Sequence, residues 1–326
     1  MACSLFRMVN MKKSALHLSS LREFVMLIIL LIMVGLLSLL SPAFARLNNF
    51  INIFKQTAIN GILAVGMGCV ILTGGFDLSV GSIVGLSGVV AALLAQGDMP
   101  ILIPILSAIG IGGAAGLLNG TLVSYLGIPA FVVTLGTQNF IRGLAYIISG
   151  GRPVFGVSRA YEQIAGMNIF GQVPLLVVYY LAIVAIFAFI LKKTVYGRHI
   201  YLVGGNAEAA RVSGINVKGV KLSVYMIAGL LAGIAGMLLT SRTVSGSPIT
   251  GSGYELDAIA AVVIGGFSLS GGVGKWYGML IGALVLSVLS NGLDILGVAS
   301  YYQYLIKGII MVGAVYIDVR GRARMQ

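Results

Sequence analysis

Residues 174–193 read PLLVVYYLAIVAIFAFILKK, in which eighteen uncharged, mostly aliphatic residues are followed by two lysines. An α-helix needs about 20 predominantly apolar residues to cross the hydrocarbon core of a bilayer. A helix that is apolar on every side must be buried, either in a large core or in a membrane. Lysines are also favoured at the cytoplasmic end of a membrane helix. This stretch therefore predicts a transmembrane helix.

The rest of the chain repeats this pattern. Hydrophobic residues make up 58% of the chain and charged residues only 9%, against about 25% charged in a soluble domain. No polar segment between residues 24 and 317 is long enough to form a separate soluble domain. We expect one all-α domain over residues 1–326, a polytopic integral membrane bundle of about ten transmembrane helices. The predicted spans lie near 24–42, 56–73, 79–96, 101–126, 129–149, 174–191, 222–240, 256–267, 276–293 and 302–317.

Glycine indicates how these helices pack. The chain has 46 glycines, roughly twice the average usage of about 7%. They lie within apolar stretches, where glycine lets two helices approach closely. Gly112, Gly116 and Gly120 share one face of a predicted helix because they are four residues apart. Gly229 and Gly233 repeat this spacing, so we expect both faces to be helix–helix contacts.

Basic residues indicate the orientation, because lysine and arginine favour the cytoplasmic side. They gather in the N-terminal tail 1–23, the hydrophilic segment 192–221 and the C-terminal tail 318–326. All three segments are therefore expected in the cytoplasm, which requires an even number of spans, and 150–173 is expected in the periplasm. The net charge of +12 is then a signal of topology and not of nucleic-acid binding. The basic residues of these three segments are Arg7, Lys12, Lys13, Arg22, Lys192, Lys193, Arg198, Arg211, Lys218, Lys221, Arg320, Arg322 and Arg324.

The first 45 residues admit a second interpretation. A basic beginning, an apolar run and the small-residue string Ala43-Phe44-Ala45 fit the outline of a secretory signal peptide. The apolar run over 24–40, however, is longer than the 7–15 residues usual in a signal peptide. Cleavage would also leave an odd number of spans and a periplasmic N-terminus. We therefore expect this run to be the first transmembrane helix.

The spans are not accompanied by a catalytic or metal-binding motif. LSGGVGK at 269–275 resembles part of an ATPase signature, but the sequence has no phosphate-binding loop GxxxxGK[ST]. Cys3 and Cys69 are too few for a cysteine-based metal site, and His17 and His199 lie in polar, basic segments where we expect them to be solvated. We therefore expect no enzymatic activity, no cofactor and no metal in this chain.

Segment 192–221 contains a short predicted helix outside the membrane. Gly204-Gly205 is expected to form a flexible turn, and Asn206 is a favourable N-cap residue. Gly214 is suited to ending the helix in the left-handed conformation. A helix of about two turns is marginal in water and needs a partner. The segment is either a simple connector or a docking element.

The sequence of this helix resembles a known signature. Residues 208–214, EAARVSG, are similar to the EAA-x3-G signature of ATP-binding-cassette (ABC) importer permeases. The longer string GGNAEAARVSGINV resembles the branch that serves ribose, allose, xylose, galactose and related sugars. GGFDLSVGS at 74–82, GYELDAIAAVVIGG at 253–266 and NGLDILGVASYYQ at 291–303 resemble the same branch. The resemblance covers about residues 47–318.

The resemblance implies a permease subunit in the bacterial inner membrane. It implies a cytoplasmic ABC ATPase, a periplasmic sugar-binding protein and a second permease copy, commonly an identical one. In this family the signature forms the coupling helix, which docks into a groove of the ATPase. Ala209 and Ala210, with their small side chains, are expected against the wall of that groove. The coupling residues carried over to this chain are Gly204, Gly205, Asn206, Glu208, Ala209, Ala210, Ser213 and Gly214.

Polar residues in or beside the spans are candidates for a translocation pathway, because such side chains usually face a cavity or another helix. GGFDLS at 74–79 recurs as GGFSLS at 265–270, and paired glycine-broken segments can mark a pathway. Interhelical hydrogen bonding is the alternative for each residue. The candidates are Asn60, Thr73, Asp77, Gln138, Asn139, Glu255, Asp257, Asn291 and Gln303.

These features favour import of a small monosaccharide, ribose- or allose-like, driven by ATP hydrolysis on a partner subunit. One alternative is a permease of the same superfamily for another solute, such as a branched-chain amino acid or a furanose-like signal molecule. The other is an ion-coupled secondary transporter. The scarcity of charges within the spans and the EAA-like segment weigh against this last alternative.

Overall fold

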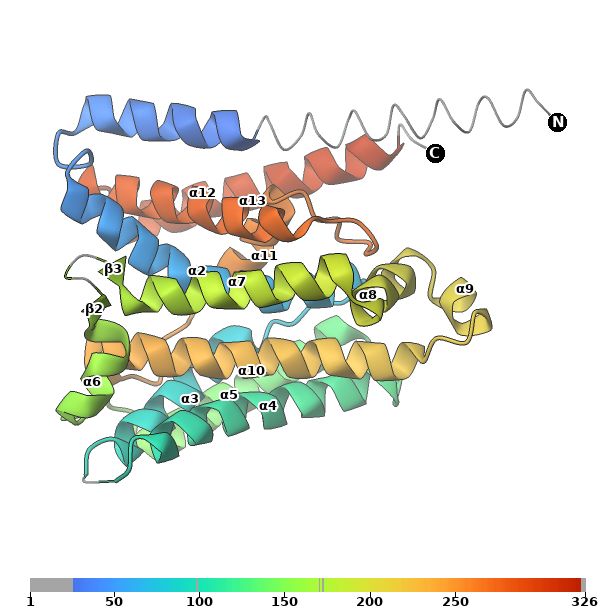
Figure 1. The fold of residues 1–326 in the computed structure, drawn as a ribbon, viewed down its shortest axis with the longest axis horizontal. Coiled ribbons are helices and arrows are strands. Elements are labelled where there is room, and N and C mark those ends of the chain that lie inside the picture. The colour runs from blue at the N-terminus through green and yellow to red at the C-terminus, as the bar shows by residue number, and fades with distance from the viewer. Residues whose placement is uncertain (1–25, 98, 170, 172, 324–326) are drawn as a thin grey trace.

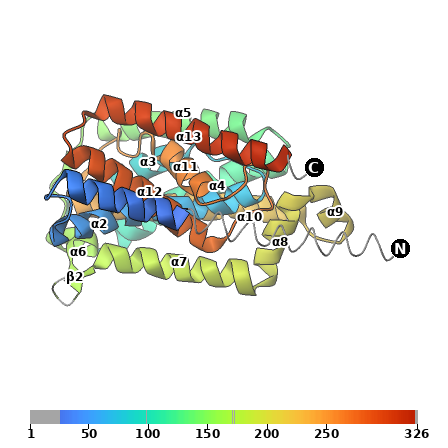
Figure 2. The ribbon, with the colours of Figure 1, turned by 90° about the horizontal axis from the view of Figure 1, so that it is seen from above.

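The computed structural model describes residues 26–97, 99–169, 171 and 173–323. Its helices run side by side and form an elongated bundle (Figure 1). Seen from above, α7 (Leu175–Lys193) and α13 (Ser300–Ala323) lie on opposite edges of this bundle (Figure 2). The predicted N-terminal tail 1–23 and residues 324–326 of the predicted C-terminal tail lie outside the described residues.

Each predicted apolar stretch lies in one helix of the described chain. These helices are Met26–Leu40, α2 (Leu47–Leu72), α3 (Val80–Leu94), α4 (Leu102–Ser124), α5 (Ala130–Ser149), α7, α10 (Val217–Thr243), α11 (Tyr254–Ile264), α12 (Trp276–Ile295) and α13. Six of them, α2, α4, α5, α7, α10 and α12, are long and apolar enough to cross a membrane. The chain is therefore a polytopic helical membrane protein.

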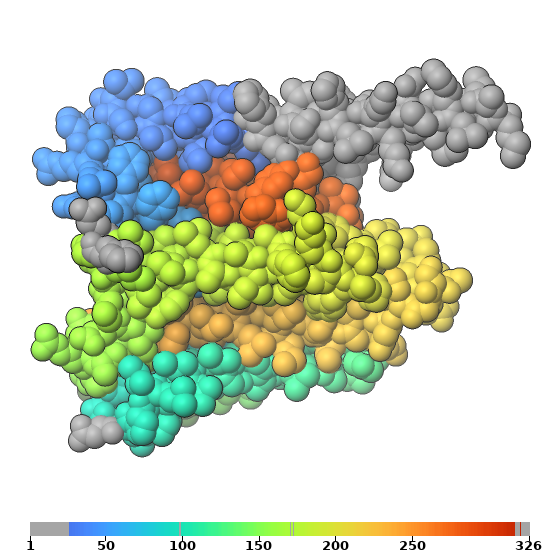
Figure 3. Space-filling view, viewed as in Figure 1, coloured from blue at the N-terminus to red at the C-terminus, as the bar shows by residue number. Residues whose placement is uncertain are grey.

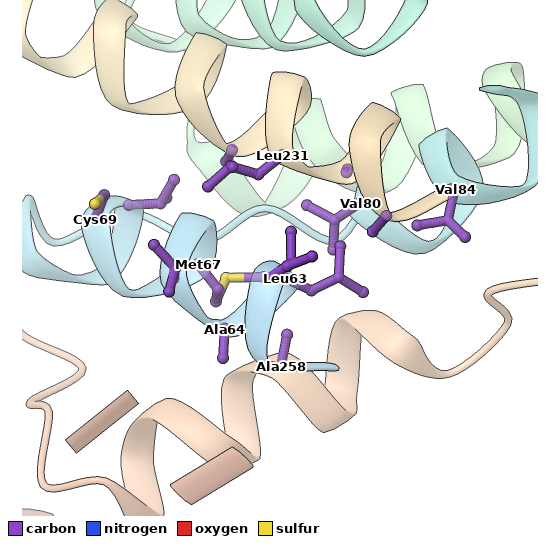
Figure 4. Close-up of a cluster of buried hydrophobic side chains, with 14 of the residues drawn as sticks. Leu63, Ala64, Met67, Cys69, Val80, Val84, Leu231 and Ala258 are labelled. Atoms are coloured by element: carbon purple, nitrogen blue, oxygen red, sulfur yellow. The ribbon is translucent and has the colours of Figure 1, made fainter. Parts of the chain in front are cut away.

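Helix α2 occupies the centre of the bundle and packs against α7, α10, α11 and α12. Its second half is buried on almost every side, because alanine, glycine and aliphatic residues occupy all of its faces. Leu63 and Met67 lie between Leu231 of α10 and Ala258 of α11 (Figure 4). Van der Waals packing of this kind is a main source of helix association in lipid.

The glycine faces predicted from the sequence meet each other across α4 and α10. A Cβ atom at Gly116 would lie 2.3 Å from the carbonyl oxygen of Tyr225. One at Gly229 would lie 2.2 Å from the carbonyl oxygen of Gly112. The two helices therefore cross with their backbones in contact, which a larger residue at these positions would prevent. The prediction of a glycine-mediated helix contact is confirmed.

The two ends of the bundle differ. At one end, called the α9 end here, α8 (Val195–Gly205) leads to α9 (Ala207–Val212), which projects beyond the neighbouring helices (Figures 1 and 3). At the opposite end, called the α6 end, α6 (Arg159–Gly166) lies against α10, where the hydroxyl of Ser241 donates to the carbonyl of Tyr161 at 2.7 Å. Helix Met26–Leu40 ends at the α6 end, and α13 ends toward the α9 end (Figure 1).

The all-α prediction holds for the spans but omits two small ribbons of the described residues. β1 (Val154–Phe155) pairs antiparallel with β4 (Ser245–Gly246), with Val154 opposite Gly246. β2 (Asn168–Ile169) pairs antiparallel with β3 (Val173–Pro174). Each strand has only two residues, so the ribbons fasten connections and form no sheet core.

Two segments predicted as polar connections are mostly helical. α7 continues through Lys193, and the hydroxyl of Thr194 then accepts a hydrogen bond from the N–H of Gly197 at 3.1 Å and starts α8. α13 continues through Ala323, so the predicted C-terminal tail 318–326 begins as helix. Lysine and arginine are good helix formers, and a membrane helix can therefore extend past its apolar part.

Candidate functional site

Helix α9 has the boundaries that the sequence predicts. The side chain of Asn206 accepts a hydrogen bond from the N–H of Ala209 at 2.9 Å. Gly214 follows the helix with φ +82°, in the left-handed region. Arg211 donates to both carboxylate oxygens of Glu208, at 2.6 and 3.2 Å. These hydrogen bonds lower the pKa of Glu208 below its ordinary value, so the pair stays ionised at neutral pH.

Gly204 and Gly205 do not form a flexible turn, and that prediction is wrong. They are the last two residues of α8. A Cβ atom at Gly204 would lie 1.7 Å from the carbonyl oxygen of Leu72 and 2.6 Å from the backbone nitrogen of Gly272. The N–H of Gly272 donates to the same carbonyl at 2.9 Å. Glycine is required at 204 because three backbones touch there, and we call this contact the glycine junction (Leu72, Gly204, Gly272).

Only part of α9 faces outward. Ala210 is 4% exposed and belongs to the main core of the chain. It therefore packs against its own bundle and does not face outward, contrary to the prediction that it lies against a partner groove. Its small side chain instead lets α9 lie close to its own bundle. Val212 is 79% exposed, and Ala209 and Ser213 are also exposed. A partner that binds this helix would contact these three residues.

A cavity of about 490 Å³ lies beneath α9. Its wall combines the end of α2, the α4–α5 connection, α9 and the first turns of α10. Of the nine pathway candidates, only Thr73 lines it. The charged residues in its wall are Glu208, Arg211, Lys218 and Lys221.

Asp77 is fully buried just before α3. Its Oδ1 accepts hydrogen bonds from the N–H of Ser79 at 2.9 Å and from the hydroxyl of Ser79 at 2.6 Å. Asn119 of α4 donates to the hydroxyl oxygen of Ser79 at 2.8 Å and approaches Oδ1 of Asp77 at 3.4 Å. Neither large cavity includes Asp77 in its wall. These contacts join the start of α3 to α4.

Gln138 and Glu255 meet between α5 and α11. Nε2 of Gln138 donates to Oε1 of Glu255 at 3.1 Å. Arg142, one turn further along α5, donates to the carbonyls of Pro248 and Thr250, the latter at 2.8 Å. Its guanidinium also attracts the Glu255 carboxylate electrostatically. The irregular segment that precedes α11 is thereby held against α5.

Asp257 and Gln303 line a second cavity, of about 280 Å³, between α11, α12 and α13. Oδ2 of Asp257 and Nζ of Lys307 form an ion pair at 2.9 Å. Gln303 donates to Oδ1 of Asp294 at 2.7 Å. α13 is therefore attached to α11 and to the end of α12 by polar contacts.

The remaining candidates lie elsewhere. Asn291 of α12 and Asn49 of α2 exchange two amide hydrogen bonds of 2.9 Å, as the interhelical alternative expects. Asn139 is exposed on α5 and donates to the carbonyl of Leu135 in its own helix at 3.2 Å. Asn60 is half-buried in α2. The structure thus distributes the pathway candidates over several places instead of bringing them into one site.

The two similar strings end two helices, but one residue out of register. The N–H of Gly74 donates to the carbonyl of Ile71, and Gly74 has φ +77°. The N–H of Gly266 donates in the same way to the carbonyl of Val263, and Gly266 has φ +85°. Gly74 is the first glycine of its string, whereas Gly266 is the second. The similarity reflects two helix ends of the same type.

Two cationic side chains that make polar contacts between helices were not among the residues predicted from the sequence, although the sequence contains a signal for both. Arg142 lies within the apolar stretch 129–149 and Lys307 within 302–317. An ionisable residue inside a span is costly and is usually paired. The pathway candidates predicted from the sequence were acids, amides and one threonine, and included no cation. Asn49 and Ser79 gave no such signal, because nothing in the sequence connects them to their distant partners.

Comparison with known proteins agrees with the helical membrane fold. A family model described as branched-chain amino acid transport system / permease component matches residues 49–315. The chain is 44% identical over 296 residues to the ribose import permease protein RbsC of Escherichia coli (strain K12), covering 90% of this chain and 92% of that protein. It is 45% identical to RbsC of Bacillus subtilis (strain 168), covering 89% and 90%. It is 38% identical to the D-allose transport system permease protein AlsC of Escherichia coli (strain K12), covering 89% of each. No solved structure matches the chain.

Proposed function

Because this chain belongs to the family of branched-chain amino acid transport system permease components, we propose that it is the membrane subunit of a bacterial ABC importer for a small monosaccharide, ribose- or allose-like. The observation that carries the proposal is the identity of 38–45% to permeases named for ribose and D-allose, over 89–90% of the chain. In this proposal a separate cytoplasmic ATPase hydrolyses ATP, and a periplasmic binding protein delivers the sugar.

The proposed orientation places the α9 end in the cytoplasm and the α6 end in the periplasm. Lys192 and Lys193 occupy the last turn of α7, immediately before α8. Lys218 and Lys221 lie in the first turns of α10, immediately after α9. Basic residues beside spans favour the cytoplasmic side. The described C-terminal end of the chain, at the end of α13, lies at this same end of the bundle (Figure 1), which suits a cytoplasmic C-terminus.

A second copy of this chain is proposed to complete the translocation pathway. Asn139 is exposed on α5, with Gln138 beside it in the chain and Glu255 behind it in the bundle. A polar side chain on the exposed face of a membrane helix seldom faces lipid. Covering this face of α5 with a second copy would place Asn139 in a polar pathway between the two subunits.

Uptake into proteoliposomes tests the proposed function directly. The permease is reconstituted with the ATPase and binding protein expected to be encoded beside its gene. Radiolabelled ribose is expected to accumulate only with ATP, and to do so after ionophores have collapsed all ion gradients. Uptake that requires an ion gradient and no ATP would contradict the proposal. The family description makes a branched-chain amino acid the second candidate, and accumulation of leucine but not ribose or allose would favour it.

Labelling of single cysteines is expected to confirm the orientation. The variants Ala160→Cys and Glu208→Cys are made in a background with Cys3→Ser and Cys69→Ala. Both positions are exposed at opposite ends of the bundle. In intact spheroplasts an impermeant thiol reagent should label position 160 but not 208, and permeabilisation should expose 208. Labelling of 208 but not 160 in intact cells would reverse the assignment.

Two substitutions at Gly214 separate backbone conformation from side-chain bulk. A Cβ atom there meets no neighbour within 4 Å, so only its φ of +82° restricts it. Valine in the left-handed region costs roughly 1–2 kcal/mol or more, whereas asparagine adopts it readily. Gly214→Val is expected to reduce the stimulation of ATP hydrolysis by sugar-loaded binding protein about tenfold, with normal membrane insertion. Gly214→Asn should stay close to wild type, and an unaffected Gly214→Val would make this segment a simple connector.

A further inference from the structure

The cavity beneath α9 carries an excess of positive charge. Arg211, Lys218 and Lys221 line it together with one carboxylate, that of Glu208. Arg211 pairs with this carboxylate at 2.6 Å, and Nζ of Lys218 lies 5.6 Å from the ring centre of Tyr125. Within the described part of the chain, Lys221 has no hydrogen-bond or ion-pair partner. Two positive charges are therefore left without a counter-charge in the wall of one cavity.

The uncharged part of the wall is largely apolar. The most buried side chains in its wall are those of Thr73 and Tyr225, which are 4% and 1% exposed. The α4–α5 connection supplies a side formed by Ile128, Pro129 and Ala130. The volume of about 490 Å³ is within the range of roughly 300–1,000 Å³ typical of small-molecule pockets. The cavity thus suits a ligand with an anionic group and an uncharged, partly apolar remainder.

We propose that this cavity binds a phosphate ester, with the phosphate between Arg211 and Lys221 and the esterified group along the α4–α5 connection. A phosphate of charge −1 or −2 would neutralise the excess positive charge of the cavity wall. Guanidinium groups also bind phosphate oxygens well. Arg211 can take part while paired, since its bonds to Glu208 use Nε and Nη2 and leave Nη1 available.

The surroundings favour an anionic phospholipid as the source of the phosphate. The α4–α5 connection joins two helices with exposed apolar faces, on which Leu117 is 45% and Phe131 59% exposed. A lipid tail could follow such a face while its headgroup enters the cavity. Basic pockets between membrane helices on the cytoplasmic side bind anionic headgroups. This step rests on the proposed function, which places the α9 end at the cytoplasmic leaflet.

A ligand in this position would connect three elements of the α9 end. The phosphate would touch α9 through Arg211 and α10 through Lys221, and its ester group would touch the α4–α5 connection. The resting position of α9 would then depend on the anionic lipid content of the membrane. A soluble phosphate ester would have the same effect through its concentration in the cytoplasm.

The test measures binding to the purified permease alone, so it does not depend on transport or on the ATPase. Native mass spectrometry of detergent-purified protein titrated with phosphatidylglycerol gives the Kd, with phosphatidylcholine as the neutral reference lipid. Lys221→Gln removes the cation without a partner. Lys193→Gln removes an exposed cation at the same end that does not line the cavity, and Lys221→Arg restores the charge. Glycerol 3-phosphate is titrated separately as the soluble probe.

Lys221→Gln is expected to raise the Kd for phosphatidylglycerol at least about fivefold, while Lys193→Gln and Lys221→Arg change it little. Binding of glycerol 3-phosphate to wild type but not to Lys221→Gln would support the site and identify a soluble ester as its ligand. The proposal is overturned if both probes bind wild type and Lys221→Gln equally, or if Lys193→Gln weakens binding as much. Failed sugar uptake with intact lipid binding would refute only the proposed function.

Discussion

The variant Gly116→Ile is expected to yield little folded protein. A Cβ atom at this position would lie 2.3 Å from the carbonyl oxygen of Tyr225 and 2.9 Å from the Cα atom of Met226. Both neighbours are backbone atoms of α10, so no side chain can move aside, and the two helices must separate. Inserting a larger side chain into a packed site usually lowers the free energy of unfolding by about 1–3 kcal/mol, and a clash with backbone atoms should reach or exceed the upper end of this range. A loss of this size should lower cellular abundance several-fold.

A matched control lies on the same helix. A Cβ atom at Gly110 meets nothing within 4 Å, so Gly110→Ile adds the same side chain without a clash. Both substitutions change helix propensity equally, and the difference between them isolates the contact with α10. Fluorescence-detected size-exclusion chromatography should show a single wild-type-like peak for Gly110→Ile and a small or aggregated one for Gly116→Ile. Equal peaks for the two variants would mean that α4 and α10 do not cross in this way.

The second large loss of stability is expected for the variant Arg142→Met. The substitution removes the donor to the carbonyls of Pro248 and Thr250 and leaves the buried Glu255 carboxylate without its nearby cation. Removing one member of a buried charge pair typically costs about 3–5 kcal/mol. The midpoint of thermal unfolding in detergent should fall by about 5 °C or more. Cys69 is buried and free, so a thiol-reactive fluorescent dye reports unfolding in a Cys3→Ser background.

A double variant distinguishes a lost charge interaction from lost packing. Arg142→Met with Glu255→Gln removes the buried charge together with its counter-charge, and Gln138 can still hydrogen-bond the new amide. The double variant is therefore expected to unfold at a higher temperature than Arg142→Met alone. Arg152→Met, in the exposed connection after α5, serves as the control and should match wild type. A double variant less stable than Arg142→Met would show that Glu255 contributes independently of the cation.

The sequence predicted the helices well because each span is a local, nearly uninterrupted apolar pattern. It also predicted α9, since the N-cap Asn206 and the left-handed Gly214 act on their own neighbours. It misjudged Gly204, because a glycine needed for a turn and one needed for a backbone contact look the same in sequence. The pathway candidates failed to converge for a related reason. Whether Asn291 meets a substrate or Asn49 depends on a helix more than 200 positions away.

The glycine junction has a mechanical consequence. Side chains in most helix contacts can change rotamer and absorb a small displacement, but backbone atoms have no such freedom. The contact of Gly204 with Leu72 and Gly272 therefore has almost no compliance. A displacement of α9 pulls on α8 one residue away, and the end of α2 and the loop before α12 must follow by a comparable distance. The end of α2 and the loop before α12 are then displaced together with α9. The stiffness of this one contact therefore determines how much of a displacement at the surface is transmitted to the centre of the bundle.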